Sequence, residues 1–265
     1  MEQADLTDDA FMGGRLRLLQ PRRGHRVGHD AALLAAACPA APGETVVDLG
    51  AGVGAVGLAI AARVAAKVLL VEFDPALAEL ARENIRRNGL DGRAAVVEAD
   101  VAAAAEARRA AGLGPETADH VVSNPPFYAP GASRVAEEKR AAHVADAAVL
   151  DAWMRSAVSV LRHGGCLTLI HRPEALPRLL AAAGGRLGDL RIRGVHTAPG
   201  RAALRILFQG TRGRRGGLRL LPGLTLTDSA GRNTAATEAV LRGEALVPMS
   251  TTSRGEPCRN RSSTV

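Results

Sequence analysis

The chain has 265 residues, of which 47% are hydrophobic, and it carries a formal net charge of +7 at pH 7. This length allows one large hydrophobic core with short additions. No stretch resembles the roughly 20 apolar residues of a membrane helix. The acidic start, residues 1–9, fits neither a secretory signal nor a transit peptide. We therefore expect a soluble, cytoplasmic protein that does not span a membrane.

The three cysteines, Cys38, Cys166 and Cys258, are odd in number and far apart. They match neither a disulfide framework nor the paired spacing of metal ligands, so we expect reduced thiols and no metal. The basic balance suits a polyanionic partner, because Lys and Arg neutralise phosphates. Nearly all of it is arginine, beside much alanine and glycine, which also indicates a compositional bias. Charge alone therefore leaves nucleic-acid binding open.

The first 40 residues precede the first predicted strand. Residues 20–29 are basic and contain glycine, which on its own is typical of a surface loop. Asp30 can cap an apolar helical run at residues 31–37, because a carboxylate accepts the free N–H groups of a first helical turn. The same argument predicts a helix that begins at Pro75 with Asp74 as its cap.

From residue 44 onward, short β-branched or apolar runs alternate with longer Ala-, Leu- and Arg-rich segments of helical period. This pattern predicts an α/β fold with a doubly wound, seven-stranded, mostly parallel sheet. The predicted strands are 45–49, 68–73, 94–98, 120–123, 166–171, 191–195 and 203–208. The predicted helices are 55–65, 75–88, 101–111, 146–161 and 173–183. We expect an N-terminal segment (1–40), a main domain (41–248) and a tail (249–265) that is disordered.

A glycine-rich turn, Asp48-Leu49-Gly50-Ala51-Gly52-Val53-Gly54, follows the first of these strands and opens a helix. Glycines allow a sharp turn and a close approach of a ligand, although such a turn can also exist without one. The spacing is not the G-x-G-x-x-G of dinucleotide sites, and the carboxylate of Asp48 would repel a phosphate. S-adenosylmethionine carries a sulfonium and an ammonium and no phosphate. We therefore predict this cofactor, held by Asp48, Gly50, Ala51 and Gly52.

Two more acids lie at the ends of the next two strands, Glu72 within the strand and Asp100 just past it. Glu72 is placed to accept hydrogen bonds from both ribose hydroxyls, and Asp100 to accept one from the adenine amino group, between apolar walls from Phe73 and Val101. Either acid alone would more often be a helix cap or a solvated side chain than a ligand-binding group. Three acids at three successive strand ends favour a cofactor site.

The most informative stretch is Ser123-Asn124-Pro125-Pro126-Phe127-Tyr128, after the fourth strand. The Asn124 side-chain oxygen and the Pro125 carbonyl can each accept one N–H of a planar amine, which turns its lone pair toward the methyl group. The prolines fix φ and keep these acceptors in place. Phe127 supplies a stacking face.

We predict Asn124, Pro125 and Phe127 as catalytic, with Asn124 also at the cofactor, and Pro126, Phe127 and Tyr128 as substrate-binding. A dedicated general base is not required, because the amine proton becomes acidic once the nitrogen is methylated. The alternative is a proline turn whose aromatic residue packs in the core. This alternative is less favoured because the glycine turn lies upstream in the same sheet.

These residues resemble the class I methyltransferases that methylate planar amines: residues 48–54 look like their first motif and 124–127 like their catalytic tetrapeptide. From about residue 11 to 247 the chain is similar to the bacterial family that methylates N(6) of the adenosine 3′ to the anticodon of a valine tRNA. The likeness also includes residues 20–37, 142–143 and 150–153. It implies a Rossmann-like fold, S-adenosylmethionine as cofactor and tRNA as partner. It further implies that residues 26–30 close over the methionine end of the cofactor, with Asp30 near it.

Other functions stay open at this point. A glutamine side-chain amide in a protein is also a planar amine, but families that methylate it usually carry a helical N-terminal domain, for which about 40 residues are too few. A DNA adenine methyltransferase would need more residues for target recognition. A non-catalytic nucleotide- or RNA-binding module would keep the turn and leave the Asn-Pro-Pro-Phe pocket without a role.

Overall fold

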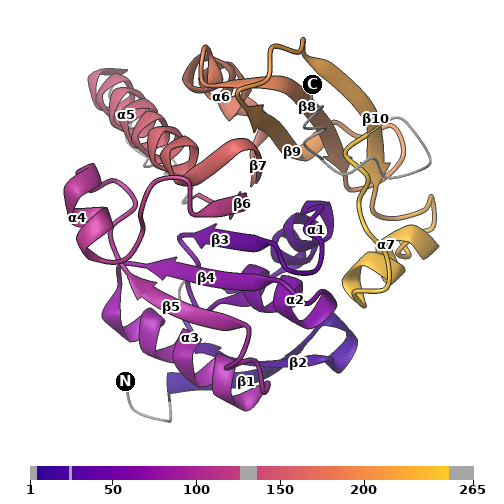
Figure 1. The fold of residues 1–265 in the computed structure, drawn as a ribbon. Coiled ribbons are helices and arrows are strands. Elements are labelled where there is room, and N and C mark those ends of the chain that lie inside the picture. Colours follow the sequence, from indigo (N-terminus) through magenta and orange to yellow (C-terminus); the bar gives the residue numbers. More distant parts are fainter. Residues whose placement is uncertain (1–4, 24–25, 126–135, 251–265) are drawn as a thin grey trace, which may run out of the picture.

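The computed structural model describes residues 5–23, 26–125 and 136–250, and of residues 136–147 the backbone alone. Its main sheet has eight strands: β3 (Thr45–Leu49), β4 (Lys67–Glu72), β5 (Ala94–Glu98), β6 (Ala118–Ser123), β7 (Leu161–His171), β8 (Leu187–His196), β9 (Ala203–Arg212) and β10 (Arg219–Thr225). Their order across the sheet is β10-β8-β9-β7-β6-β3-β4-β5 (Figure 1). Only β9 runs antiparallel to its neighbours, β7 and β8. The order turns back at β3, where β4 lies on one side and β6 on the other.

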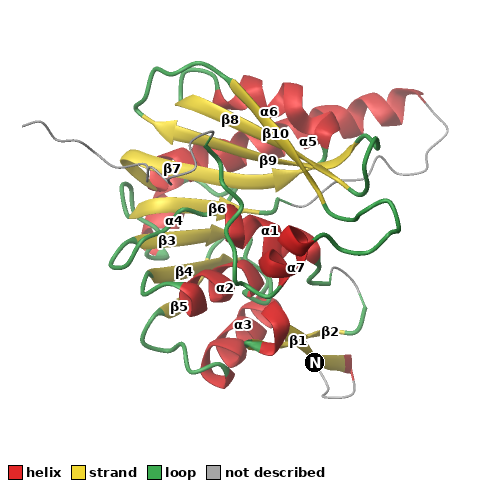
Figure 2. Ribbon diagram, turned by 90° about the vertical axis from the view of Figure 1, so that its right-hand side faces the viewer, coloured by secondary structure: helices red, strands yellow, loops and turns green. Residues whose placement is uncertain are grey.

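Helices cover both faces of this sheet. They are α1 (His29–Ala37), α2 (Ala55–Arg63), α3 (Pro75–Arg87), α4 (Ala105–Ala110), α5 (Ala136–Val160), α6 (Leu176–Ala183) and α7 (Ala235–Leu241). Figure 2 shows α1, α2 and α7 in front of the stacked strands, whereas α4, α5 and α6 lie across the sheet from them in Figure 1. Along β3, Val46 packs in the core under α1 and α2, and Val47 and Leu49 pack in the core under α5 and α6. Both faces are buried, which is why the strand reads as a continuous apolar run.

The predicted α/β class is confirmed, and each of the seven predicted strands lies within or overlaps a strand of the sheet. The predicted count of seven was wrong, because β10 adds an eighth strand beside β8. Pro222 and Gly223 interrupt its pattern, and the pairing shifts register between Leu221 and Leu224. A proline and a bulge are tolerated at a sheet edge, where the missing ladder bond faces outward.

The N-terminal segment forms a hairpin of β1 (Leu6–Phe11) and β2 (Leu16–Pro21) that packs on α3. Two asparagines, Asn84 of α3 and Asn88 at its C-cap, bind the edge of β2 as a neighbouring strand would. Asn84 accepts from the Leu19 N–H (2.7 Å) and donates to the Leu19 carbonyl (3.0 Å). Asn88 bonds the Arg17 N–H and carbonyl in the same way, at 2.9 Å each.

The two predicted helix caps had different outcomes. Asp74 caps α3 as predicted, accepting from the Ala76 and Leu77 N–H groups at 2.8 and 3.3 Å, with Pro75 in the first turn. The prediction for Asp30 was wrong, because Gly28 is the N-cap of α1 and Asp30 lies inside its first turn. The carboxylate of Asp30 instead pairs with Arg205, as described below.

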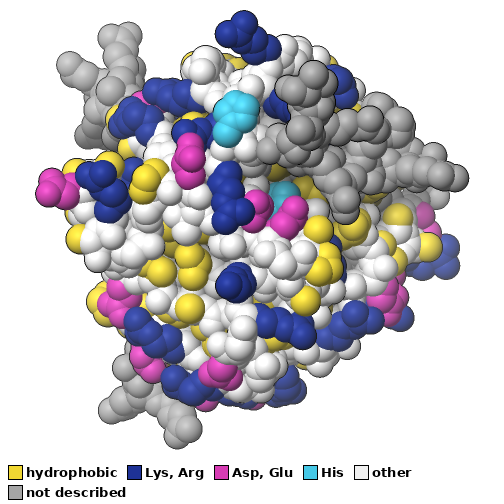
Figure 3. Space-filling model, viewed as in Figure 1, with side chains coloured by type: hydrophobic (Ala, Val, Ile, Leu, Met, Phe, Trp, Pro, Cys, Tyr) yellow, Lys and Arg dark blue, Asp and Glu magenta, His cyan; other side chains and the backbone are white. Residues whose placement is uncertain are grey.

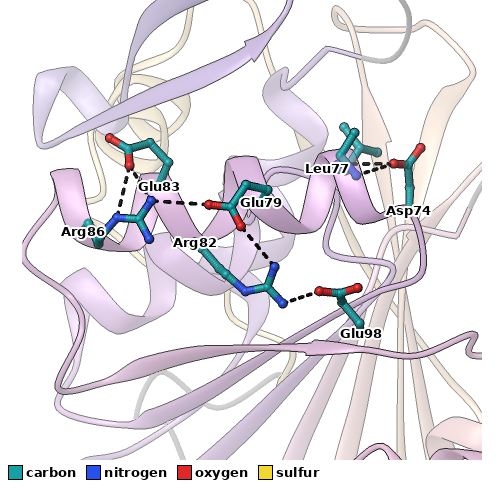
Figure 4. A network of polar contacts seen from close by, with 8 residues as sticks. Asp74, Leu77, Glu79, Arg82, Glu83, Arg86 and Glu98 are labelled. Atoms are coloured by element: carbon teal, nitrogen blue, oxygen red, sulfur yellow. Dashed lines mark hydrogen bonds and ion pairs between the residues drawn. The ribbon is translucent and has the colours of Figure 1, made fainter. Parts of the chain in front are cut away.

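The outer face of α3 carries a row of ion pairs among Glu79, Arg82, Glu83, Arg86 and Glu98 of β5 (Figure 4). All five side chains are more than a third exposed, so each pair contributes little to stability. Within the part of the chain that the structure describes, no helix is long and apolar enough to cross a membrane.

Candidate active site

The glycine turn lies at the carboxyl end of β3, beside the point where the strand order turns back. Gly50, Gly52 and Gly54 have φ angles of +73°, +56° and +90°, which L side chains rarely adopt. Gly54 is the N-cap of α2. The glycines at these three positions are therefore required by the turn itself, before any ligand is considered.

The N–H groups of this turn point to protein acceptors. Gly50 and Ala51 both donate to the Val71 carbonyl at 2.9 Å, and Gly52 donates to Glu72 Oε2 at 2.7 Å. A phosphate-binding loop keeps such N–H groups for its ligand. These three are already used, which supports a ligand without phosphate at this turn.

Asp48, in β3 just before the turn, is almost completely buried. Its Oδ2 accepts from the Gly57 N–H of α2 at 2.9 Å. Burial raises the pKa of Asp48 from 3.8 to about 7, while the Gly57 hydrogen bond acts in the opposite direction and the charge of Glu72 adds to the rise. The carboxyl group is therefore poised to change its charge near neutral pH.

Glu72, at the end of β4, is also buried and holds the turn through its carboxylate. Besides the bond from Gly52, its Oε1 accepts from the N–H groups of Phe73 and Asp74 at 2.9 and 3.0 Å. A carboxylate has about four lone-pair directions, and backbone donors use three of them. The sequence predicted free acceptors for two hydroxyls, whereas the structure leaves one.

A cavity of about 460 Å³ opens at this edge of the sheet. Its wall comes from the segment before α1, the glycine turn, the end of β6 and the start of β9. The lining residues are Arg26, Val27, Gly28, His29, Asp30, Ala31, Asp48, Gly50, Ala51, Gly52, Val53, Ala55, Val56, Leu77, Asn124, Leu204 and Arg205. Six of the predicted site residues meet here: Asp30, Asp48, Gly50, Ala51, Gly52 and Asn124.

The other predicted cofactor residues do not line this cavity. Glu72 lies directly behind Gly52, and the Phe73 side chain is 70% exposed. Asp100 is exposed and accepts from the Ala102 N–H at 2.8 Å, which closes a tight local turn. Val101 is buried in the core under α5. Of the predicted target-binding residues, Pro126, Phe127 and Tyr128 lie outside the described residues.

Asn124 follows β6 and lines the cavity beside the glycine turn, because Ser123 of β6 pairs with Leu49 of β3. Its Oδ1 is buried and has no hydrogen-bond partner within residues 5–23, 26–125 and 136–250. An unpaired buried acceptor is costly, and native proteins rarely keep one without a ligand or water to fill it. Asn124 therefore presents an acceptor that needs an N–H or O–H donor from outside this part of the chain.

Two residues at or beside the cavity, Arg205 and Trp153, had not been predicted. Arg205, at the start of β9, donates from Nε to Asp30 Oδ2 at 2.7 Å, and both side chains are about four-fifths buried. No local pattern reveals this pair, because the two residues are 175 positions apart. Trp153 of α5 contacts the glycine turn, and the resemblance over residues 150–153 had marked its stretch without giving it a role.

This sheet order, with a glycine turn at the switch point, is the fold of the class I methyltransferases. The structure is similar to the crystal structure of a predicted O-methyltransferase from Agrobacterium tumefaciens, with a TM-score of 0.72 and 33% sequence identity. The match covers 82% of this chain and 98% of that one.

The sequence comparisons agree with this class. Residues 24–182 match the Methyltransferase small domain family. The chain is 30% identical over 207 residues to a Porphyromonas gingivalis protein named tRNA1(Val) (adenine(37)-N6)-methyltransferase, covering 76% of this chain and 80% of that protein. A Yersinia pestis protein of the same name is 29% identical over 239 residues, with 87% and 91% covered. The chain belongs to the methyltransferase small domain family, in the group with these relatives, and the predicted fold class and family are confirmed.

Proposed function

We propose that this chain transfers a methyl group from S-adenosylmethionine to the exocyclic N(6) amine of an adenosine in tRNA, next to the anticodon of a valine tRNA. The observation that carries the proposal is the buried, unpartnered Oδ1 of Asn124, which faces the same cavity as the glycine turn. The names of the relatives from P. gingivalis and Y. pestis support the same target atom and RNA.

The residues of the cavity fit this cofactor. Its volume of about 460 Å³ is that of a small-molecule site. Asp48 and Asp30 place carboxylates in its wall, which suits a cationic ligand, and the turn amides offer no phosphate nest. When bound, S-adenosylmethionine supplies an electrophilic methyl group on a sulfonium sulfur. Asp48, Gly50, Ala51, Gly52 and Asp30 would hold it, and residues 26–30 would close the cavity wall at its methionine end.

Glu72 would hold one ribose hydroxyl with the lone-pair direction that backbone donors leave open, on Oε2. The exposed ring of Phe73 would pack on the adenine, and the role of Val101 as a second apolar wall stays a prediction. One lone pair of the Asp100 carboxylate already accepts from the Ala102 N–H. The remaining lone pairs would accept from the adenine amino group.

Asn124 and Pro125 would orient the target amine. The Asn124 Oδ1 accepts one N–H and the Pro125 carbonyl the other, which aligns the nitrogen lone pair with the methyl group and stabilises the positive charge that develops on nitrogen. Stacking on Phe127 stays a prediction, as do the contacts of Pro126 and Tyr128. After transfer the nitrogen loses its proton to solvent, so no further base is assigned.

Other acceptors are less well supported. The A. tumefaciens protein is described as a predicted O-methyltransferase. A hydroxyl has one proton, however, so it would use only one of the two acceptors, the Asn124 Oδ1 and the Pro125 carbonyl. The comparisons do not favour a glutamine amide or a non-catalytic module. Net charge adds little, because Figure 3 shows Lys and Arg side chains spread over the viewed face with Asp and Glu among them.

The division into residues 1–40, 41–248 and 249–265 remains a proposal. The lining of the cavity by residues 26–31 supports an N-terminal segment that packs on the cofactor site. Most of the tail lies outside the described residues.

The test is the identity of the methylated nucleoside. Wild-type enzyme is incubated with isotope-labelled S-adenosylmethionine and tRNA transcribed without modifications, and the RNA is digested and separated by chromatography with mass detection. We expect label in N(6)-methyladenosine, with valine tRNA preferred over transcripts of other tRNAs. Label on a ribose oxygen, on a protein amide or on no acceptor would overturn the proposal.

A further inference from the structure

We propose that Trp153 is a positioning residue that couples the cofactor turn to Asn124, so that the two halves of the active site hold their geometry together. The inference rests on the proposed function, because it assigns the turn to the cofactor and Asn124 to the amine. Trp153 is the single tryptophan of the chain and lies in the second half of α5.

One edge of the indole holds the residue before Asn124. Its Nε1–H donates to Ser123 Oγ at 2.8 Å, and the Ser123 hydroxyl donates to the Leu49 carbonyl at 2.8 Å. Ser123 and Leu49 are also partners in the pairing of β6 with β3. These two bonds therefore link α5, the end of β6 and the end of β3 in one chain, next to Asn124 on one strand and Gly50 on the other.

The six-membered ring of the same indole packs against the glycine turn, through the atoms on the N–H side. A Cβ placed on Gly50 would lie 2.8 Å from Trp153 Cζ2 and 3.3 Å from Cη2, so the benzo ring lies directly against this residue. A displacement of the turn at Gly50 must move the indole. Because Nε1 belongs to the same rigid indole, this displacement also disturbs the bond to Ser123.

Asn124 depends on such an anchor. Its buried Oδ1 has no partner in the described part of the chain, so no hydrogen bond at that oxygen fixes the side chain. Its position must come from the backbone that carries it, which Ser123 fastens with a buried hydroxyl. A second bond keeps α5 itself in place, because Ser156, one turn after Trp153, donates to the Val101 carbonyl at 2.5 Å. The coupling therefore rests on a fixed helix.

The first test uses the wild-type protein and needs no variant. S-adenosylhomocysteine is titrated while Trp153 is excited at the red edge of its absorption band, and binding is measured in parallel by calorimetry. We expect a saturable change in emission with the dissociation constant that calorimetry gives. Calorimetric binding without any change in emission would overturn the coupling.

The second test separates positioning from a general packing role. Ser123→Ala removes the relay hydroxyl, and Trp153→Phe removes the Nε1 donor and part of the ring. The control, Ser159→Ala, removes another hydroxyl of α5, which donates to the Ser156 carbonyl, accepts from Arg108 and does not line the cavity. We expect Ser123→Ala to lower kcat about tenfold while the affinity for S-adenosylhomocysteine stays within about twofold. Trp153→Phe should lower both. The double variant should lose less kcat than the product of the two single losses, because the two residues share the Nε1–Oγ bond.

The outcomes distinguish this inference from the proposed function. A wild-type enzyme that methylates tRNA, with Ser123→Ala equal to Ser159→Ala in kcat, overturns the inference and leaves the function standing. A wild-type protein that methylates no RNA, yet changes Trp153 emission on binding S-adenosylhomocysteine, overturns the function and supports the coupling. The kcat values refer to folded enzyme, quantified from thermal unfolding of each variant.

Discussion

Two neighbouring parts of the cavity wall, the glycine turn and Asn124, differ in how their polar groups are paired. At the glycine turn, the Asp48 and Glu72 carboxylates and the N–H groups of Gly50, Ala51 and Gly52 all have protein partners. Asn124, after the neighbouring strand, carries a buried acceptor with no partner in the described part of the chain. A turn that satisfies its own groups is complete before any ligand arrives, whereas the Asn124 amide is completed only by a donor from a substrate. Changes at the turn should therefore affect folding, and changes at Asn124 the reaction.

The largest effect should follow Asn124→Ala. We expect kcat to fall about 10² to 10³-fold, as for loss of a group that stabilises developing charge in other enzymes. The affinity for S-adenosylhomocysteine should change by less than about threefold and the unfolding temperature should not fall, because the removed acceptor had no partner to lose. Single-turnover methylation, calorimetry and thermal unfolding check the three parts. A kcat within twofold of wild type would show that Asn124 does not act on the amine.

The turn should respond in the opposite way to Gly50→Ala. The new Cβ combines a φ of +73° with a 2.8 Å approach to Trp153, so we expect a loss of about 2 to 4 kcal/mol in the free energy of unfolding. Gly43→Ala is the matched control, since its φ is +83° but no atom lies within 4 Å of the added carbon. It should lose only about 1 kcal/mol. Equal losses in chemical denaturation would mean that Trp153 does not pack tightly on the turn.

The same contrast decides what could be predicted from the sequence. The turn and the Asp74 cap depend on residues close together in the chain, and their backbone requirements appear as glycines, a proline and an aspartate at fixed spacing. The missed features depend on distant partners. The β1–β2 hairpin is held by asparagines of α3 more than 60 positions away, and Asp30 by Arg205 at 175. β10 was missed because a sheet edge tolerates the Pro222 and Gly223 that otherwise argue against a strand.

Asp48 gives a third, pH-dependent prediction. Since burial raises its pKa from 3.8 to about 7, the folded chain holds this proton more tightly than the unfolded chain does. The stability gained from the proton is full below pH 3.8 and is lost as the pH rises through about 7. Asp48→Asn keeps an acceptor for Gly57 and cannot ionise. Its free energy of unfolding, relative to that of the wild type, should therefore rise by about 2 kcal/mol when the pH is raised from 5 to 8.

Denaturant unfolding at the two pH values measures this gain. The control is the exposed Asp91→Asn, which makes the same chemical change away from the turn. Parallel pH profiles for wild type and Asp48→Asn would show that the buried carboxyl titrates as in the unfolded chain.

The smallest effect concerns Asp30 and Arg205. Like the polar groups of the turn, these two side chains have a protein partner, since they pair with each other; like Asn124, they also line the cavity. An ammonium and a carboxylate at the amino-acid end of the cofactor would match this pair, the ammonium at Asp30 and the carboxylate at Arg205.

Arg205→Ala should therefore lower the affinity for S-adenosylhomocysteine about fivefold, the size expected for one partly solvated ion pair. It should leave 5′-methylthioadenosine unchanged, because that ligand lacks the amino-acid end. Arg201→Ala, exposed in the preceding turn, is the control. Equal weakening of both ligands would mean that Arg205 supports the cavity wall and does not bind the carboxylate.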